Sequence, residues 1–216
     1  MPNLAHANEN RAELEALGSA VALPAGATLV TEGDAASHLF MVRSGMLKLY
    51  RLLPDGRRQV IRFLFPGDLL GRPFEERHSA SAEALGPVSL AKLPRAGLEA
   101  LLARAPLLQR RLLGAASSEL AAAHDQMLLL GRKTARERVA SFLVMMVRRA
   151  AARGHDPRRI ALAMTRTDIA DYLGLTIETV SRTFTQLRRV GVIEIAATGA
   201  VEVADAGELA GLAEAA

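Results

Sequence analysis

The chain has 216 residues, enough for one or two domains with sizeable cores, and it contains no cysteine. The lack of cysteine excludes disulfides, thiolate metal sites, cysteine-ligated iron–sulfur clusters and a cysteine nucleophile. No apolar run approaches the roughly 18 residues that span a bilayer, and the first residues lack the basic-then-apolar pattern of a signal peptide. We therefore expect a cytoplasmic protein that does not contact a membrane.

Positive charge is concentrated in one segment. The net charge is +4, yet residues 132–189 hold 13 Lys and Arg against 5 Asp and Glu. Residues 190–216 hold 5 Asp and Glu and no Lys or Arg. A localised basic segment is the electrostatic footprint of a protein that binds nucleic-acid phosphates. The distribution therefore favours double-stranded DNA as a partner of residues 132–189.

Residues 21–95 alternate short apolar segments with turn residues. The spacing of about ten residues between turn signals is typical of an all-β roll or barrel. The expected strands are residues 28–31, 39–42, 46–52, 59–65 and 88–93. Asp55 and Gly56, between two of these strands, are a strong hairpin signal. The pattern predicts a compact β-domain in this part of the chain.

A long helix is expected after residue 105. Small or apolar residues recur in it at alternating spacings of three and four, as in a heptad seam: Leu113, Ala116, Leu120, Ala123, Met127 and Leu130. We predict that this seam is a homodimer interface, because a symmetric dimer can present two recognition helices to successive major grooves. The alternative is an amphipathic helix that packs within its own chain.

Residues 131–133 are the expected hinge before the next helix. Thr134 can cap that helix, and the loop at residues 154–157 ends it. Its buried side is expected at Val139, Phe142, Leu143, Met146 and Val147. Residues 159–163 are a candidate short strand.

Residues 165–189 predict two short helices around a tight turn. Thr165 and Asp168 can form a capping box, Gly174 supplies the turn, and Thr176 can cap the second helix. Apolar residues recur at helical spacing in the second helix and are expected to face the core: Ile177, Val180, Phe184 and Leu187. Two strands, at 190–195 and 201–203, are expected to form a hairpin behind it, which is the wing of a winged helix-turn-helix.

The other face of the second helix, residues 176–190, carries side chains that suit base edges. Glu178 can accept a hydrogen bond from cytosine N4, and Arg182 can donate two to guanine. The predicted base contacts are Ile177, Glu178, Ser181 and Arg182, and the predicted phosphate contacts are Arg166, Thr167, Thr176, Thr185 and Arg188. The alternative is a solvated helix face with an i,i+4 salt bridge.

The order of these parts resembles the CRP/FNR superfamily of bacterial transcription factors over residues 20–205. The resemblance is specific in GMLKLYRLLPDGRRQVIRFLFPGDLLG and in ARERVASFL followed by MTRTDIADYLGLTIETVSRTFTQLRRVGVIEI. It implies an α+β fold with a cupin-like β-roll of the cyclic-nucleotide-binding type in residues 1–105, a dimerisation helix in 106–131 and a winged helix-turn-helix in 132–216. It also implies a transcription activator that has RNA polymerase as a partner. No catalytic constellation supports an enzyme.

Within the superfamily, Glu178, Ser181 and Arg182 resemble the base-reading set of the FNR and FixK branches. The CRP branch normally has Gly where Ser181 stands and Arg where Ile177 stands. The resemblance implies a TTGAT-N4-ATCAA-like palindrome, in which Arg182 takes the guanine and Glu178 the opposite cytosine. Ser181 would discriminate at a neighbouring pair, and Ile177 would touch a thymine methyl.

The β-roll departs from the superfamily's cyclic-nucleotide binders, which place a Glu near a glycine turn and an Arg-Ser or Arg-Thr pair several residues later. Here Arg72 stands in place of the Glu, Arg77 is one position out of register, and His78 precedes the small residue. We therefore predict no cofactor, no metal and no tight binding of cyclic nucleotides. The alternative is an effector-gated sensor, with a shifted pocket or with haem or nitric oxide as the signal. In that case His78 or His124 is the candidate haem ligand.

Overall fold

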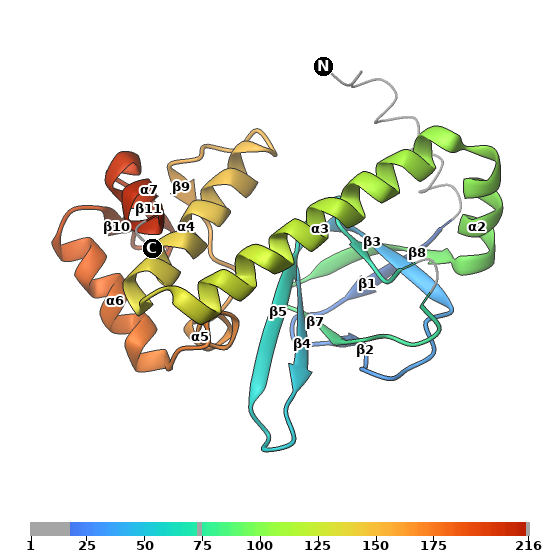
Figure 1. Ribbon diagram of the computed structural model, residues 1–216, viewed down its shortest axis with the longest axis horizontal. Helices are drawn as coiled ribbons and strands as arrows, with labels where there is room; N and C mark the ends of the chain where they lie inside the picture. Colours follow the sequence, from blue (N-terminus) through green and yellow to red (C-terminus); the bar gives the residue numbers. More distant parts are fainter. Residues whose placement is uncertain (1–17, 73–74, 215–216) are drawn as a thin grey trace. The chain divides into compact units, whose positions relative to one another are not determined.

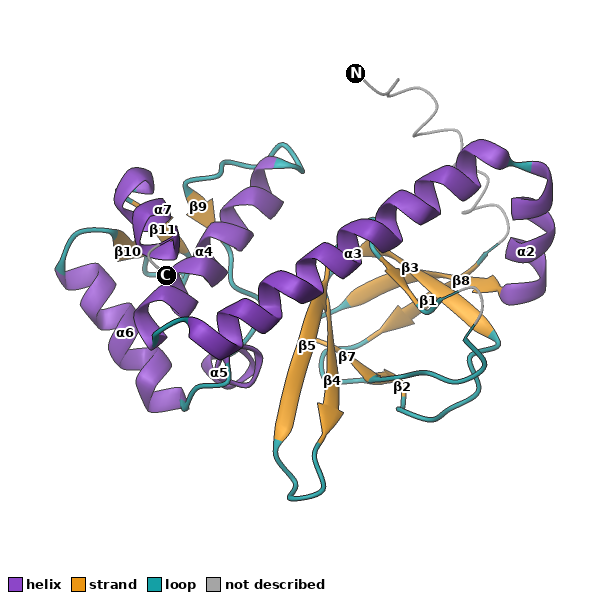
Figure 2. Ribbon diagram, viewed as in Figure 1, coloured by secondary structure: helices purple, strands orange, loops and turns teal. Residues whose placement is uncertain are grey.

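The computed structural model describes residues 18–72 and 75–214 (Figure 1). The first seventeen residues of the predicted domain 1–105 therefore lie outside the described part. The chain divides into two compact units, Met1–Glu119 and Leu120–Ala216. The first is mostly strands, and the second is mostly helices with a small sheet (Figure 2). The predicted α+β fold is confirmed.

In the described residues of the first unit there are eight strands: β1 (Ser19–Leu23), β2 (Thr28–Val30), β3 (His38–Ser44), β4 (Leu47–Leu52), β5 (Arg58–Leu64), β6 (Leu69–Leu70), β7 (Ser81–Ala84) and β8 (Val88–Pro94). They pair into two antiparallel sheets with the orders β1-β8-β3-β6 and β2-β7-β4-β5. Asp55 and Gly56 lie in the turn between β4 and β5, as the hairpin signal predicted.

Both faces of strand β3 are buried. Phe40 and Val42 belong to the core that joins the two sheets, whereas Leu39 and Met41 pack in a second cluster with helix α2 (Arg95–Arg104). Successive side chains of a strand point to opposite faces. A strand covered on both sides therefore carries an unbroken apolar run, and this explains why its sequence lacks polar alternation.

The five predicted strands are confirmed to within two residues at each end, but the sequence prediction missed three others and α2. The missed strands are β1, with the sequence SAVAL, β6, with LL, and β7, with SAEA. Ser, Ala and Glu have little intrinsic preference for strands. β7 forms because it pairs with β2 on one side and β4 on the other, which is a tertiary effect.

The second unit takes up the rest of the chain. Its elements are the C-terminal half of α3 (Pro106–Arg132), then α4 (Ala135–Ala151), β9 (Arg159–Ile160), α5 (Arg166–Leu173), α6 (Ile177–Arg189), β10 (Ile193–Ile195), β11 (Val201–Val203) and α7 (Ala206–Glu214). The three strands form one sheet in the order β10-β11-β9. None of the helices in the described residues is long and apolar enough to cross a membrane.

The predicted short strand 159–163 is found only at Arg159–Ile160, and two other boundaries also differ from the predictions. Helix α3 continues through Gly131 and ends at Arg132, so two of the three residues of the predicted hinge are helical and only Lys133 and Thr134 lie between α3 and α4. The wing strand starts at Ile193 rather than at residue 190, because Gly191 has a φ of 75° and the chain turns there. The predicted cap at Thr134 and the end of α4 before residues 154–157 are confirmed, and Glu137 completes the cap as a capping box.

Candidate nucleic-acid interface

Helix α5 starts at a capping box, as predicted. The Thr165 hydroxyl accepts from the backbone N–H of Asp168 at 3.1 Å, and the backbone N–H of Thr165 donates to the Asp168 carboxylate at 3.0 Å. The Thr165 hydroxyl also donates to that carboxylate, at 2.6 Å. These bonds satisfy backbone donors that a helix start leaves without partners, and they fix where α5 begins.

The turn between α5 and α6 depends on Gly174. Its φ of 61° is in the left-handed region, where a side chain is disfavoured. A Cβ at this position would also lie 3.2 Å from Leu130 Cδ2, so there is little room for one. Thr176 then caps α6, since its hydroxyl accepts from the Thr179 backbone N–H at 3.2 Å. Both predictions are confirmed.

Helix α6 has one apolar face and one polar face. Val180, Phe184 and Leu187 are buried as predicted, and Thr183 is buried with them. Ile177 was wrongly expected in the core, because it is 43% exposed in the first turn of the helix, beyond the packed face. The exposed face carries Ile177, Glu178, Ser181, Arg182 and Thr185.

Hydrogen bonds and a nearby charge favour the ionised form of Glu178. Its own backbone N–H, the Thr176 hydroxyl and then the Arg182 charge hold the pKa of this carboxyl below its usual range. An ionised carboxylate only accepts hydrogen bonds, which is the role that a cytosine N4 partner requires. Arg182 has a long contact of 3.4 Å to the Thr179 hydroxyl and is otherwise exposed. The two side chains therefore offer an acceptor and a donor fork on one helix face.

The predicted phosphate contacts differ in how exposed their side chains are. Thr167, Thr176, Thr185 and Arg188 are exposed, although the Thr176 hydroxyl serves the cap and the Thr185 hydroxyl donates to the Ser181 carbonyl. Arg166 differs, because it is half-buried and its guanidinium lies 3.5 Å from the centre of the Phe184 ring. Burial lowers its pKa. Arg166 therefore packs α5 against α6, a role that the sequence prediction missed.

Replacing Arg166 with alanine should consequently change stability as well as DNA binding. We expect a loss of about 1 kcal/mol of unfolding free energy from the lost stacking, and a salt dependence of binding that is shallower by about one unit. Arg166→Lys should keep most of the salt slope but not the stacking. Chemical unfolding and titrations at several salt concentrations measure the two effects. An effect confined to one base pair would contradict this role.

The predicted seam lies on the surface of α3. Leu113 is 68% exposed, Leu120 59% and Met127 70%, and Ala116 and Ala123 are exposed between them. Leu130 differs from the other five because it is half-buried and lies against Gly174, so it packs within its own chain. The exposed row therefore ends at Met127.

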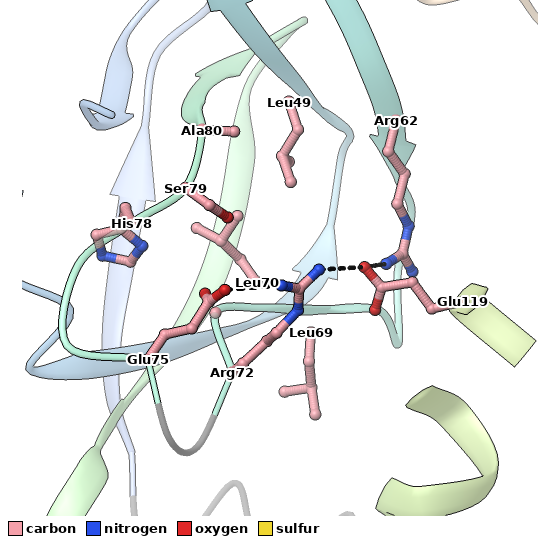
Figure 3. A pocket seen from close by; sticks show the side chains of 11 residues that line it. Leu49, Arg62, Leu69, Leu70, Arg72, Glu75, His78, Ser79, Ala80 and Glu119 are labelled. Carbon is pink, nitrogen blue, oxygen red and sulfur yellow. Dashed lines mark hydrogen bonds and ion pairs between the residues drawn. The ribbon is translucent and has the colours of Figure 1, made fainter. Parts of the chain in front are cut away.

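The β-roll has a small, half-open cavity, which Figure 3 shows from close by. Arg72 ion-pairs with Glu75 at 2.7 Å and with Glu119 of α3 at 3.7 Å. Arg62 reaches the same Glu119 oxygen at 3.2 Å. His78 is buried beside them, and burial lowers its pKa. The remaining volume is about 50 Å³.

Comparisons with known proteins identify both halves of the chain. Residues 20–105 match the cyclic nucleotide-binding domain, and residues 137–212 match the Crp-like helix-turn-helix domain. The nitrogen fixation regulation protein FixK of Bradyrhizobium diazoefficiens is 45% identical over 183 residues, which are 85% of this chain and 77% of that protein. The chain belongs to the CRP/FNR family.

Other members of the CRP/FNR family agree with this assignment. The transcriptional activatory protein AadR of Rhodopseudomonas palustris is 43% identical over 187 residues, 87% of this chain and 78% of AadR. The solved structure of FixK2 from Bradyrhizobium japonicum has a TM-score of 0.86 at 37% identity, and the match covers 92% of this chain and 98% of FixK2. FixK is named as a regulation protein and AadR as a transcriptional activatory protein, so neither name describes an enzyme.

The β-roll cavity does not fit the cyclic nucleotide after which its domain is named. Ligand sites usually offer about 300 to 1,000 Å³, many times the volume found here. Both cationic side chains of the cavity, Arg62 and Arg72, pair with carboxylates, so a cyclic phosphate would have to displace these pairs. Arg77 donates to the Gly33 carbonyl instead of lining the cavity, so it does not supply a shifted pocket.

Proposed function

We propose that this CRP/FNR-family protein is a homodimeric transcription activator that recognises a TTGAT-N4-ATCAA-like palindrome without a small-molecule effector. DNA binding and transcription regulation follow from the family. The observation that supports recognition of this palindrome is the exposed set of base-reading side chains on α6, which are Glu178, Ser181 and Arg182. This set resembles the one in the FNR and FixK branches, and its acceptor and donor groups suit the two bases of a G·C pair.

Dimerisation is supported by the exposed row on α3 that runs from Leu113 to Met127. Large apolar side chains are costly to leave in water, and their heptad spacing suits a parallel pair of helices. The small residues Ala116 and Ala123 allow two helix backbones to approach closely. A two-fold dimer also matches a palindromic site, whose half-sites lie about one helical turn apart.

A contact with RNA polymerase is part of the proposal. We place it on the β-roll surface and on residues 154–157, which are exposed in the loop after α4. The support is the resemblance to activators such as AadR. A regulator of this kind works in the cytoplasm, where the bacterial chromosome lies.

Selection of bound DNA from random sequence tests the proposal most directly. The purified protein is used in air with no added ligand. We expect enrichment of TTGA-type half-sites in inverted repeat. Enrichment of single, unpaired half-sites would contradict the dimer, and enrichment only after addition of a small molecule would contradict effector independence.

Titration with cyclic AMP tests effector independence separately. Because the cavity is small and its arginines are paired, we expect operator affinity to stay constant up to millimolar cyclic AMP. Operator binding followed by fluorescence anisotropy gives the measurement. A saturable tenfold rise in affinity, about 1.4 kcal/mol of coupling, would contradict effector independence and show that the β-roll binds cyclic AMP.

A further inference from the structure

Arg138 has an unusual set of partners in the second unit. Its Nε donates to the Lys133 carbonyl at 2.9 Å, and its Nη2 donates to the Leu130 carbonyl at 2.9 Å. Its Nη1 donates to the carbonyls of Leu173 at 2.9 Å and Gly174 at 3.4 Å. One guanidinium thus contacts the end of α3 and the end of α5 together.

The carbonyl groups at these two helix ends need partners. The carbonyl of Leu130 would normally accept from residue 134, but the Thr134 N–H donates to the Glu137 carboxylate in the capping box of α4. Leu173 is the last residue of α5, so its carbonyl is also left over. The Arg138 guanidinium donates to both carbonyl groups. It also places a positive charge at the negative ends of two helix dipoles.

The position of Arg138 on its own helix is electrostatically unfavourable. It lies in the first turns of α4, where the helix dipole disfavours a cation. Its placement is therefore explained by the two other helix ends rather than by α4. Gly174 leaves room beside these groups, because a Cβ there would touch Arg138 Nη1 at 3.5 Å and would crowd Leu130 Cδ2 at 3.2 Å.

A second side chain strengthens the same link. Gln126 of α3 donates from Nε2 to the Tyr172 carbonyl in the last turn of α5, at 2.9 Å. The carbonyl groups of residues 172–174 are thus held by one residue from α3 and one from α4. Since α6 follows α5 after only three residues, these bonds also fix the direction of α6 relative to the end of α3.

We propose that Arg138 is the positioning residue that sets the separation of the two recognition helices in the dimer, and with it the half-site spacing that the regulator accepts. The inference rests on the proposed palindrome-reading homodimer. One added base pair moves a half-site by about 3.4 Å along the DNA axis. A rigid link between α3 and α6 therefore rejects a palindrome with a longer or shorter spacer.

Arg138→Lys tests the proposal, because lysine keeps the charge but cannot bridge four carbonyls with a planar fork. Arg148→Lys, at an exposed position on the same helix, is the matched control. Affinities are measured for a single half-site and for palindromes with spacers of three, four and five base pairs. The wild type and the control should prefer one spacer. In Arg138→Lys this preference should fall about tenfold, the size of one charge-assisted hydrogen bond, with half-site affinity kept within about twofold.

The outcomes separate the possible roles. An unchanged spacer preference in Arg138→Lys would overturn the inference, as would a loss of half-site and full-site affinity by the same factor. If Arg138→Lys does not fold by circular dichroism, Gln126→Leu decides, because it weakens the same link from α3. A reduced spacer preference in that variant supports the inference, and an unchanged one refutes it. A wild type without any spacer preference would instead refute the palindrome-reading dimer.

Discussion

Replacing Arg182 with alanine should lower affinity for the palindrome by about 1–3 kcal/mol for each guanine contact, and a dimer makes two such contacts. The reason is that Arg182 is exposed on the polar face of α6, where its fork can donate to guanine O6 and N7. Preference at that base pair should relax while neighbouring positions keep theirs. Selection from random DNA and competition titrations with single-base variants measure both effects.

Arg188→Ala is the control for Arg182→Ala, because Arg188 is an exposed arginine near the other end of the same helix. As a predicted phosphate contact it should weaken all sequences alike and make the salt dependence shallower by about one unit. If Arg182→Ala selected an unchanged motif with unchanged affinity, α6 would not be reading bases through this face.

Replacing Leu120 with glutamate should give a folded monomer with weak operator binding. Leu120 lies in the middle of the exposed row on α3, and a two-fold axis would bring the two glutamates together without cationic partners. A monomer loses the gain from binding both half-sites at once, so affinity should fall by about 100-fold or more. Sedimentation velocity and operator titrations give the two measurements.

Leu128→Glu is the matched control for Leu120→Glu. Leu128 is as exposed as Leu120 on the same helix, but it lies about 100° around the helix from Met127 and so off the seam. This variant should remain a dimer with near-normal affinity. An unaltered dimer in Leu120→Glu would mean that α3 pairs through a different face.

The elements that the sequence predicted best are those with local chemical signals. The Thr165–Asp168 capping box, the left-handed turn at Gly174 and the Thr176 cap each depend on a side chain bonding to nearby backbone, or on a missing Cβ. Such effects act within a few residues. These short-range bonds determine the two helices around the turn without any long-range contact.

The same reasoning failed where distant packing decides. Periodicity assigned Ile177 to the core, yet Ile177 lies beyond the packed part of α6. It also could not show that Leu130 of the predicted dimer seam is half-buried against Gly174. Helical periodicity predicts which face of a helix carries a side chain, but it does not predict which other part of the chain covers that face. Strand β7 was missed for a related reason, since its two neighbouring strands, rather than its own residues, make it a strand.

By itself, the sequence determined the order of the parts, the boundaries of the helix-turn-helix, the polar face of α6 and the concentration of positive charge, because these follow from composition, spacing and short-range hydrogen bonds. Only the tertiary structure decided that Arg166 stacks on Phe184, that Arg72 and Arg62 converge on Glu119, and that Arg138 joins two helix ends. In each case the groups come from different elements, and a long, flexible arginine can reach many partners. The fold alone determines which of them lies within hydrogen-bonding distance.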